Sequence, residues 1–260
     1  MDLSFELPHK RLNILGKHND VNFTLAHLVH NEEYLSHYRD STKYTICDNS
    51  AFELQRPLPA PEVIKAASLL KAQEVIAPDS FGNGTGTIQT TEEFLKYMDD
   101  SGTRGKFRVM GVVQGANVPD WVQCMLYMKE NKHIDVLGFS YIGCKSFDQN
   151  ISNARIGAVR YATNEVLGGL KKPIHLLGMG GNPIELVAHK DVENVRSCDT
   201  SIPVVQGLSC DKFCPEKGLL GKKLPRPDDY FDVDPSPEQM ESIVHNILTM
   251  KQWVGTTVNV

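Results

Sequence analysis

The residues of this chain best suited to chemistry are acidic and amide side chains that end short apolar runs. Asp199 lies within such a setting, and Pro203 predicts that the chain does not continue there as a helix. Asp48, Asp79 and Gln114 each end another β-like run. Carboxylates gathered at strand ends are how a barrel enzyme builds a site that cleaves and remakes a glycosidic bond. We therefore expect these side chains to share one site for that chemistry.

The elements that must position these side chains alternate along the chain. Apolar, β-branched runs predict strands at residues 12–15, 44–47, 75–77, 109–113, 136–139, 174–177 and 195–198. Amphipathic stretches predict helices at residues 25–38, 61–70, from 91 onward, 120–131, 154–167, 183–189 and 237–253. Thr91, which two acids follow, suits a helix N-terminus, and Ser236 suits the cap of the last helix.

Repeated strand-then-helix units indicate a parallel sheet, either a (β/α)8 barrel or an open doubly wound sheet. No Gly-rich dinucleotide fingerprint follows the first strand, and polar residues end nearly every strand, so we favour the barrel. The eighth strand is hard to place, with residues 204–205 as the candidate. The prediction is one α/β domain over residues 1–260, an irregular (β/α)8 TIM barrel with an irregular insertion at about 207–235 and a closing helix at about 236–254.

The composition is that of an ordinary globular protein, with 41% hydrophobic and 23% charged residues. The sequence has no recognisable signal peptide and no apolar run long enough to span a membrane, so we expect a cytoplasmic protein without membrane contact. The six cysteines lack the spacing of a disulfide framework, which indicates reduced thiols.

The net charge of −5 is unusual for a protein that coats nucleic acid along one face. Any contact with nucleic acid must therefore come from a local basic patch. The candidate patch lies in residues 212–226 and holds Lys212, Lys217, Lys222, Lys223 and Arg226. A solvated surface loop is the alternative interpretation of this segment.

Each strand-end motif also has a simpler structural interpretation. The Asp-Asn-Ser run at 48–50 suits an Asx turn, and residues 79–84 suit another turn. The Gly-rich run at 178–181 could hold a phosphate at a helix N-terminus or merely form a tight turn. It is the appearance of all these motifs on successive strand-helix units that points to a site.

Taken in order, the motifs match the pattern of a known family over roughly residues 45–205. That family's Asp-Ser-Gly-Gly-Phe/Tyr element resembles residues 48–52, its base-reading aspartate resembles Asp79, and its Val-Gln-Gly element is present at 113–115. Its Gly-Tyr-Ala-x-Gly-Gly, Tyr-Leu-Met-Gly-Val-Gly and Phe-Asp-Cys-x-x-Pro-Thr-Arg elements resemble residues 138–143, 175–180 and 198–205. The family is the tRNA-guanine transglycosylase superfamily, whose members exchange guanine for a 7-deazaguanine base on an irregular (β/α)8 barrel.

The resemblance implies two catalytic residues. Asp199 would attack the anomeric carbon of a guanosine nucleotide and form a covalent glycosyl ester. Asp48 would protonate the departing guanine and then take a proton from the incoming base. The target base must leave its helix stack to enter such a site.

The resemblance also implies a set of base-binding residues. Asp79 would accept hydrogen bonds from the N1–H and the exocyclic amine of the purine. Gln114 and the Gly143 N–H would donate to its O6. Phe52 and Leu177 would form the two apolar faces that sandwich the ring.

Departures from the family pattern bear on metal and polymer. Where the family has an arginine after the nucleophile, this chain has Val205. In this chain only Cys210, Cys214 and His245 correspond to zinc ligands of the family. These three residues do not complete a structural tetrahedral site. We expect no cofactor, with zinc as the alternative. A short, zinc-poor chain looks more like the phage or bacterial members that place 7-deazaguanines in DNA. The expected partners are therefore DNA and a base such as 7-cyano-7-deazaguanine. If the protein is phage-encoded, we expect it in the host cytoplasm.

Three other functions stay open at this point. The chain could act on tRNA, as the common family members do. It could act on free nucleosides or nucleobases as a transferase or hydrolase, and would then have no use for the basic patch. It could also be an inactive subunit that assists another chain, although the presence of both Asp48 and Asp199 argues against that. A homodimer is left open as well.

Overall fold

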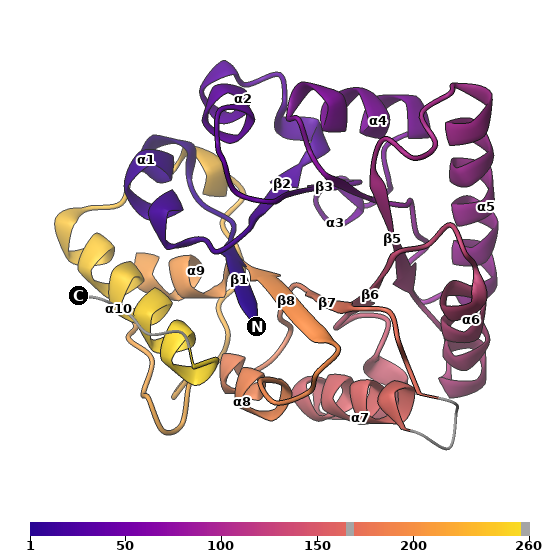
Figure 1. Ribbon diagram of the computed structural model, residues 1–260. Coiled ribbons are helices and arrows are strands. Elements are labelled where there is room, and N and C mark those ends of the chain that lie inside the picture. Colours follow the sequence, from indigo (N-terminus) through magenta and orange to yellow (C-terminus); the bar gives the residue numbers. More distant parts are fainter. Residues whose placement is uncertain (165–168, 256–260) are drawn as a thin grey trace.

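The computed structural model describes residues 1–164 and 169–255, and within them eight parallel strands form one nearly closed barrel (Figure 1). This confirms the predicted (β/α)8 fold class. The strands are β1 (Asp2–Phe5), β2 (Asn22–Leu25), β3 (Thr45–Asp48), β4 (Glu74–Ile76), β5 (Arg108–Val113), β6 (Val136–Ser140), β7 (Ile174–Leu177) and β8 (Val195–Thr200).

Helices surround the barrel (Figure 1), and the strand residues are mostly buried on both faces. This explains why they read as continuous apolar runs in the sequence. The α-helices are α1 (Leu12–Leu15), α2 (Glu32–Arg39), α3 (Ala51–Leu54), α4 (Ala60–Leu69), α5 (Gly84–Asp100), α6 (Val118–Glu130), α7 (Ile151–Thr163), α8 (Leu186–His189), α9 (Ile202–Leu208) and α10 (Pro237–Trp253). Short 3-10 helices lie between them: η1 (His9–Arg11), η2 (Gly16–His18), η3 (Ala26–Leu28), η4 (Lys145–Phe147), η6 (Pro183–Glu185) and η7 (Tyr230–Asp232).

The predicted first strand at residues 12–15 is wrong. That apolar run forms α1, and the first two strands are β1 and β2 on either side of it. A four-residue apolar run cannot be assigned to helix or strand by its pattern alone. Residue 25, where the sequence predicted a helix to begin, instead ends β2, and the helix begins only at Glu32 behind its Asn31 cap.

The predicted eighth strand at residues 204–205 is also wrong. These two valines belong to α9, whose first turn contains Pro203. A proline stabilises the first turn of a helix because its missing N–H has no partner there in any case. Pro203 therefore helps to begin a helix directly after β8, which contradicts the prediction that it prevents one.

Helix caps determine where the remaining elements begin. Asn83 accepts a hydrogen bond from the Gly86 N–H, so α5 begins at Gly84 and not at Thr91 as predicted. Helix α7 ends at Thr163, and residues 165–168, which include the predicted helix end at 167, lie outside the described residues. The cap at Ser236 is confirmed, because Ser236 and Gln239 form a capping box at the start of α10.

The barrel has one seam. Strand β1 pairs with β8 and each later strand pairs with its neighbour, so the hydrogen-bonded order runs from β1 through β8 to β2 without a ladder between β1 and β2. A side chain spans part of this seam, where the Phe23 N–H donates to Ser4 Oγ at 2.9 Å. Between α9 and α10 the chain forms turns and only a 3-10 helix. In the described ranges, no helix is both long and apolar enough to cross a membrane.

Candidate active site

A cavity of about 110 Å³ opens at the carboxyl ends of the strands, where barrel enzymes carry their sites. At roughly 10–15 Å³ for each water molecule, it has room for several waters or a small planar ring. Among the described residues that line it are five carboxylates and two cations: Glu6, Asp48, Glu53, Asp79, Asp199, Lys223 and Arg226. All three aspartates predicted from the sequence therefore meet in one cavity.

Asp199 lies near the end of β8 with one carboxylate oxygen held and the other not. Its Oδ1 accepts the His175 Nε2–H at 3.0 Å and the Gly178 N–H at 3.1 Å. No hydrogen bond reaches Oδ2 within the part of the chain that the structure describes. The side chain is therefore fixed by one oxygen while the other keeps its lone pairs for a ligand.

The donors to Asp199 are themselves held in place. His175 is fully buried, its Nδ1 lies 2.7 Å from Ser197 Oγ, and its ring stacks on Phe23 at 5.6 Å between centroids. The two ring nitrogens of His175 thus join Ser197 on one side to Asp199 on the other. Gly178 has a φ of +58°, a conformation that glycine adopts without strain.

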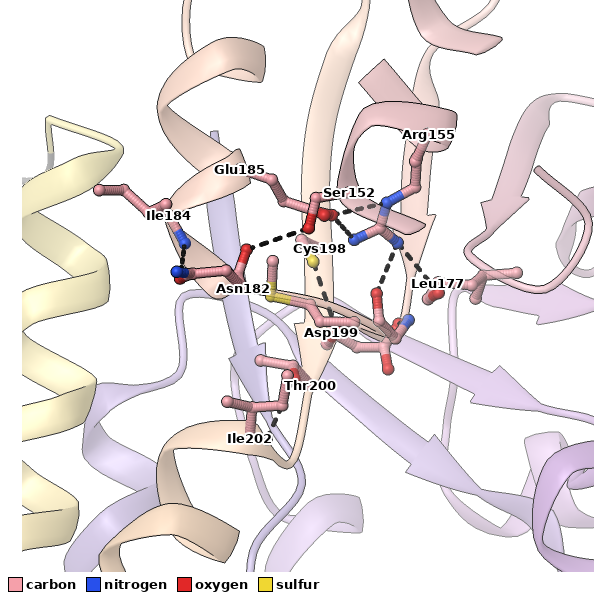
Figure 2. Close-up of polar contacts among 12 residues, drawn as sticks. Ser152, Arg155, Leu177, Asn182, Ile184, Glu185, Cys198, Asp199, Thr200 and Ile202 are labelled. Atoms are coloured by element: carbon pink, nitrogen blue, oxygen red, sulfur yellow. Dashed lines mark hydrogen bonds and ion pairs between the residues drawn. The ribbon is translucent and has the colours of Figure 1, made fainter. Parts of the chain in front are cut away.

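A buried ion pair supports the end of β7 (Figure 2). Arg155 on α7 is fully buried and its Nε donates to Glu185 Oε1 at 2.8 Å. Its Nη1 donates to the backbone carbonyls of Leu177, at 3.2 Å, and Gly178, at 2.5 Å. Arg155 thus fixes the backbone of Leu177, which ends β7, and of Gly178, which follows it and donates to Asp199.

Asp48 ends β3 in surroundings that favour its neutral form. Its Oδ2 accepts the Ser50 N–H at 2.7 Å, which is the Asx turn that the sequence offered as the simpler interpretation. Burial, and then the charge of Glu53, raise the pKa of Asp48 well above its usual range, and Asp79 and Asp199 act in the same direction. The turn and a site role are therefore compatible, since the turn uses only one oxygen.

Asp79 lies in the cavity wall with both oxygens bonded. Asn49 Nδ2 donates to Oδ1 at 3.1 Å, and Gln114 Nε2 donates to Oδ2 at 2.7 Å. Burial still raises the pKa of Asp79, while these two hydrogen bonds oppose the rise. Each oxygen has two lone pairs, so Asp79 can accept further bonds from a ligand.

Gln114 and Gly143 do not line the cavity; they lie behind Ser140, which does. The Gly143 N–H donates to Ser140 Oγ at 2.9 Å, and Gln114 Nε2 donates to the same oxygen at 3.3 Å. Both predicted donors are therefore engaged with the protein. Among the described residues, no acceptor is present for the hydrogen of the Ser140 hydroxyl, which leaves that hydrogen available to a ligand.

Phe52 and Leu177 both line the cavity, as predicted for the two apolar faces. Phe52 is 44% exposed and its ring meets the edge of Tyr141 at 6.4 Å between centroids. Gly138 makes room for Leu177, because a Cβ at position 138 would lie 2.7 Å from Leu177 Cδ1.

The predicted basic patch is divided by the structure. Lys223 and Arg226 line the cavity, whereas Lys212, Lys217 and Lys222 do not. Lys212 instead pairs with Glu241 on α10 at 2.6 Å. Lys223 lies 5.3 Å from the centre of the Tyr141 ring, and burial together with the charge of Arg155 lowers its pKa.

Arg226 joins two carboxylates of the cavity. It contacts Glu6 at 2.7 Å and Glu53 at 2.8 Å, and the side chains of both acids are about nine-tenths buried. Burial, then the nearby charge of Glu53, raise the pKa of Glu6 to about 8, although Arg226 opposes the rise and Asp199 adds to it. Arg226 therefore contacts both acids, while burial and neighbouring negative charge act against the ionised form of Glu6.

The residues that resemble zinc ligands have other surroundings in this structure. His245 lies with Nε2 3.0 Å from the backbone carbonyl of Phe213, and Cys214 Sγ lies 3.2 Å from Glu216 Oε2. Cys210 is exposed on the surface. Nowhere in residues 1–164 and 169–255 does a group of three or more histidine, cysteine, aspartate or glutamate side chains come together to hold a metal ion.

Sequence reasoning missed several residues of the cavity. Glu6 escaped notice because it follows β1, a strand that was not predicted. Ser140 and Tyr141 line the cavity, and His175 holds Asp199 from within β7; all three belong to motifs of the sequence but their roles were not predicted. The polar character of a strand end was the available signal for Ser140, whereas Glu53, on a short helix, carried no periodic signal at all.

Two comparisons with known proteins give no relative. No protein-family model matches the chain, and no curated protein matches it. The class that the fold and cavity define is thus a barrel with a carboxylate-rich site at its C-terminal rim. The family resemblance of the motifs remains a prediction.

Proposed function

We propose that this protein is a base-exchange pentosyltransferase that replaces guanine in DNA with a 7-deazaguanine derivative. The observation that carries the proposal is the pairing of Asp199 and Asp48 in one cavity with opposite surroundings. Asp199 has donors on one oxygen and a free second oxygen, and burial raises the pKa of Asp48. A nucleophile and an acid need such a difference.

In the first half of the reaction, Asp199 Oδ2 attacks the anomeric carbon of the target nucleotide. The bond from that carbon to the guanine nitrogen breaks as the ester bond forms, and Asp48 gives its proton to the departing base. The His175 and Gly178 donors hold Asp199 in position, at 3.0 and 3.1 Å. A carboxylate suits this role because it also stabilises an oxocarbenium-like transition state.

In the second half, the incoming 7-deazaguanine takes the place of guanine. Asp48, now ionised, removes a proton from its ring nitrogen, which attacks the anomeric carbon as the ester bond to Asp199 breaks. Asp79 would accept from the N1–H and the amine of either base, and Ser140, supported by Gln114 and Gly143, would donate to O6. Phe52 and Leu177 would cover the faces of the ring.

The contacts available to phosphate support a nucleic acid substrate over a free nucleoside. Lys223 and Arg226 lie at the same cavity as the carboxylates, although the chain as a whole has a net charge of −5. Cations placed locally beside a cavity are what phosphate binding requires. The absence of the family's arginine at Val205 favours a polymer other than tRNA, and tRNA stays the second candidate.

The decisive experiment measures entry of radiolabelled guanine into duplex DNA and, separately, into bulk tRNA, with Asp199→Ala as control. We expect label in DNA that depends on Asp199. Label only in tRNA would support the second candidate and overturn the DNA assignment. Incorporation into neither polymer would reject base exchange into nucleic acid and favour a free nucleoside or nucleobase as the substrate.

A further inference from the structure

One apolar residue at the cavity has no place in the chemistry described so far. Of the large hydrophobic side chains that the described part of the chain leaves exposed, Phe52 and Phe81 line the cavity. Phe52 packs against Tyr141, but Phe81 makes no contact with another aromatic ring among the described residues. With 38% of its surface exposed, Phe81 is an unpaired aromatic side chain beside the site.

The backbone on both sides of Phe81 is fixed. The Ser80 N–H donates to Thr87 Oγ1 at 3.0 Å, and the Gly82 N–H donates to Gln114 Oε1 at 3.2 Å. The Asn83 N–H closes the loop onto the Ser80 carbonyl at 3.1 Å. An exposed aromatic ring on a tethered loop is thus presented in a defined position rather than as part of a mobile tip.

The depth of the cavity determines what a nucleic acid must do here. Asp199 is only 3% exposed, so the anomeric carbon of a target nucleotide can reach it only if that nucleotide leaves the double helix. Extrusion leaves a gap in the base stack, and proteins that disturb the stack often insert an apolar side chain there. Phe81 is an apolar side chain beside the cavity that the base-binding roles leave unused.

We propose that Phe81 enters the gap that the extruded nucleotide leaves in duplex DNA and stacks on the neighbouring bases. This inference rests on the proposed function, because it requires a nucleic acid substrate. Lys223 and Arg226, the two cations among the described residues that line this cavity, would be the groups to meet the phosphates beside the extruded nucleotide. Phe81 would thus act on the polymer, whereas Phe52 acts on the base.

The test uses the whole chain described here and a DNA duplex with 2-aminopurine in place of the target guanine, whose fluorescence rises when that base leaves the stack. We compare Phe81→Ala with Ile14→Ala, a matched control at an apolar residue on α1 that is 47% exposed and lies outside the cavity. Because stacking on an aromatic ring contributes substantially to binding, Phe81→Ala should lower apparent affinity for the duplex by about tenfold or more and reduce the fluorescence rise. Ile14→Ala should match the wild type.

Two further measurements distinguish the insertion of Phe81 into the base stack, called the wedge below, from other roles of this residue. Affinity for free guanine should be unchanged in Phe81→Ala and reduced in Phe52→Ala, and affinity for the same sequence as a single strand should change by less than about twofold in Phe81→Ala. Loss of guanine affinity in Phe81→Ala would make Phe81 a wall of the base pocket and overturn the proposal. Equal losses on single strand and duplex would overturn it too.

Failure of this inference and failure of the proposed function give different results. If the wild type extrudes the base more readily than Phe81→Ala but exchanges no guanine, the exchange reaction is wrong and the wedge stands. If the wild type exchanges guanine into DNA without any rise in 2-aminopurine fluorescence, exchange stands and the wedge is wrong.

Discussion

Asp199 and Asp48 line the same cavity, but the groups that surround them differ. At the end of β8, N–H donors from His175 and Gly178 hold Asp199, and a buried arginine supports the backbone behind it. At the end of β3, Asp48 receives a single backbone N–H and faces the negative charges of Glu53, Asp79 and Asp199. The difference teaches that hydrogen-bond donors and charges, placed separately, can give two identical side chains in one cavity different surroundings.

Among the substitutions that test this comparison, Asp199→Ala should have the largest effect. We expect the covalent glycosyl adduct to disappear and exchange to fall by roughly 10⁴-fold or more, because no other group replaces the nucleophile. Intact-mass spectrometry of enzyme mixed with substrate measures the adduct. Circular dichroism should show an unchanged fold, and an adduct that survives in this variant would remove Asp199 from the role.

Asp48→Asn breaks the other side. Asparagine keeps the shape and the acceptor for Ser50 but cannot donate a proton to guanine, so the exchange rate should fall by about 10²- to 10⁴-fold. In the wild type, guanine departure needs the protonated acid, so its rate should fall as pH rises through the raised pKa of Asp48. A single-turnover pH profile checks this, and an unchanged decline at high pH in Asp48→Asn would assign the acid to another group.

His175→Phe sharpens the comparison by removing a donor while keeping a ring to stack on Phe23. Loss of one preorganised donor should lower kcat by about 10²-fold, with the KM for guanine nearly constant. His175→Gln, which offers an N–H again, should recover part of the rate. Equal damage from both variants, or a change in KM alone, would argue for a purely structural histidine.

Glu6→Gln tests whether a second acid of the same cavity also has a raised pKa. An acid with a pKa raised from 4.5 to about 8 holds its proton more tightly in the folded state, so its contribution to stability falls as pH rises across that range. Glutamine has no such loss. Urea unfolding should therefore show stability that declines less steeply with pH in the variant, by at most about 1.4 kcal/mol for each pH unit. Identical slopes would contradict the raised pKa.

The smallest effect separates the two parts of the basic patch. In a plot of the logarithm of the DNA-binding constant against the logarithm of the salt concentration, Lys223→Met should reduce the steepness of the slope by about one, as expected for one lost phosphate contact. Lys212→Met should leave the slope unchanged, because Lys212 pairs with Glu241 away from the cavity. Fluorescence anisotropy across a salt series measures both. Equal effects would mean that the whole segment contacts DNA.

The sequence predicted the middle of the barrel better than its two ends. From residue 44 onward six strands were correctly expected, because alternation with helices and polar strand ends agree there. β1 and β2 are short and flank an apolar helix, which the prediction took for a strand. The error has a cost at the site, because Glu6 follows β1. Direct contacts such as Gln114 to Asp79 depend on strand register, which no single motif contains.

The seam between β1 and β2 has a consequence for synthesis. Strand β1 is the first to leave the ribosome, yet its ladder partner is β8, almost two hundred residues later. Glu6, which follows β1, can take its place beside Arg226 only after that late segment has emerged. During translation β1 therefore lacks its ladder partner until the segment that carries Asp199 has emerged, so the barrel and the cavity are completed late in synthesis.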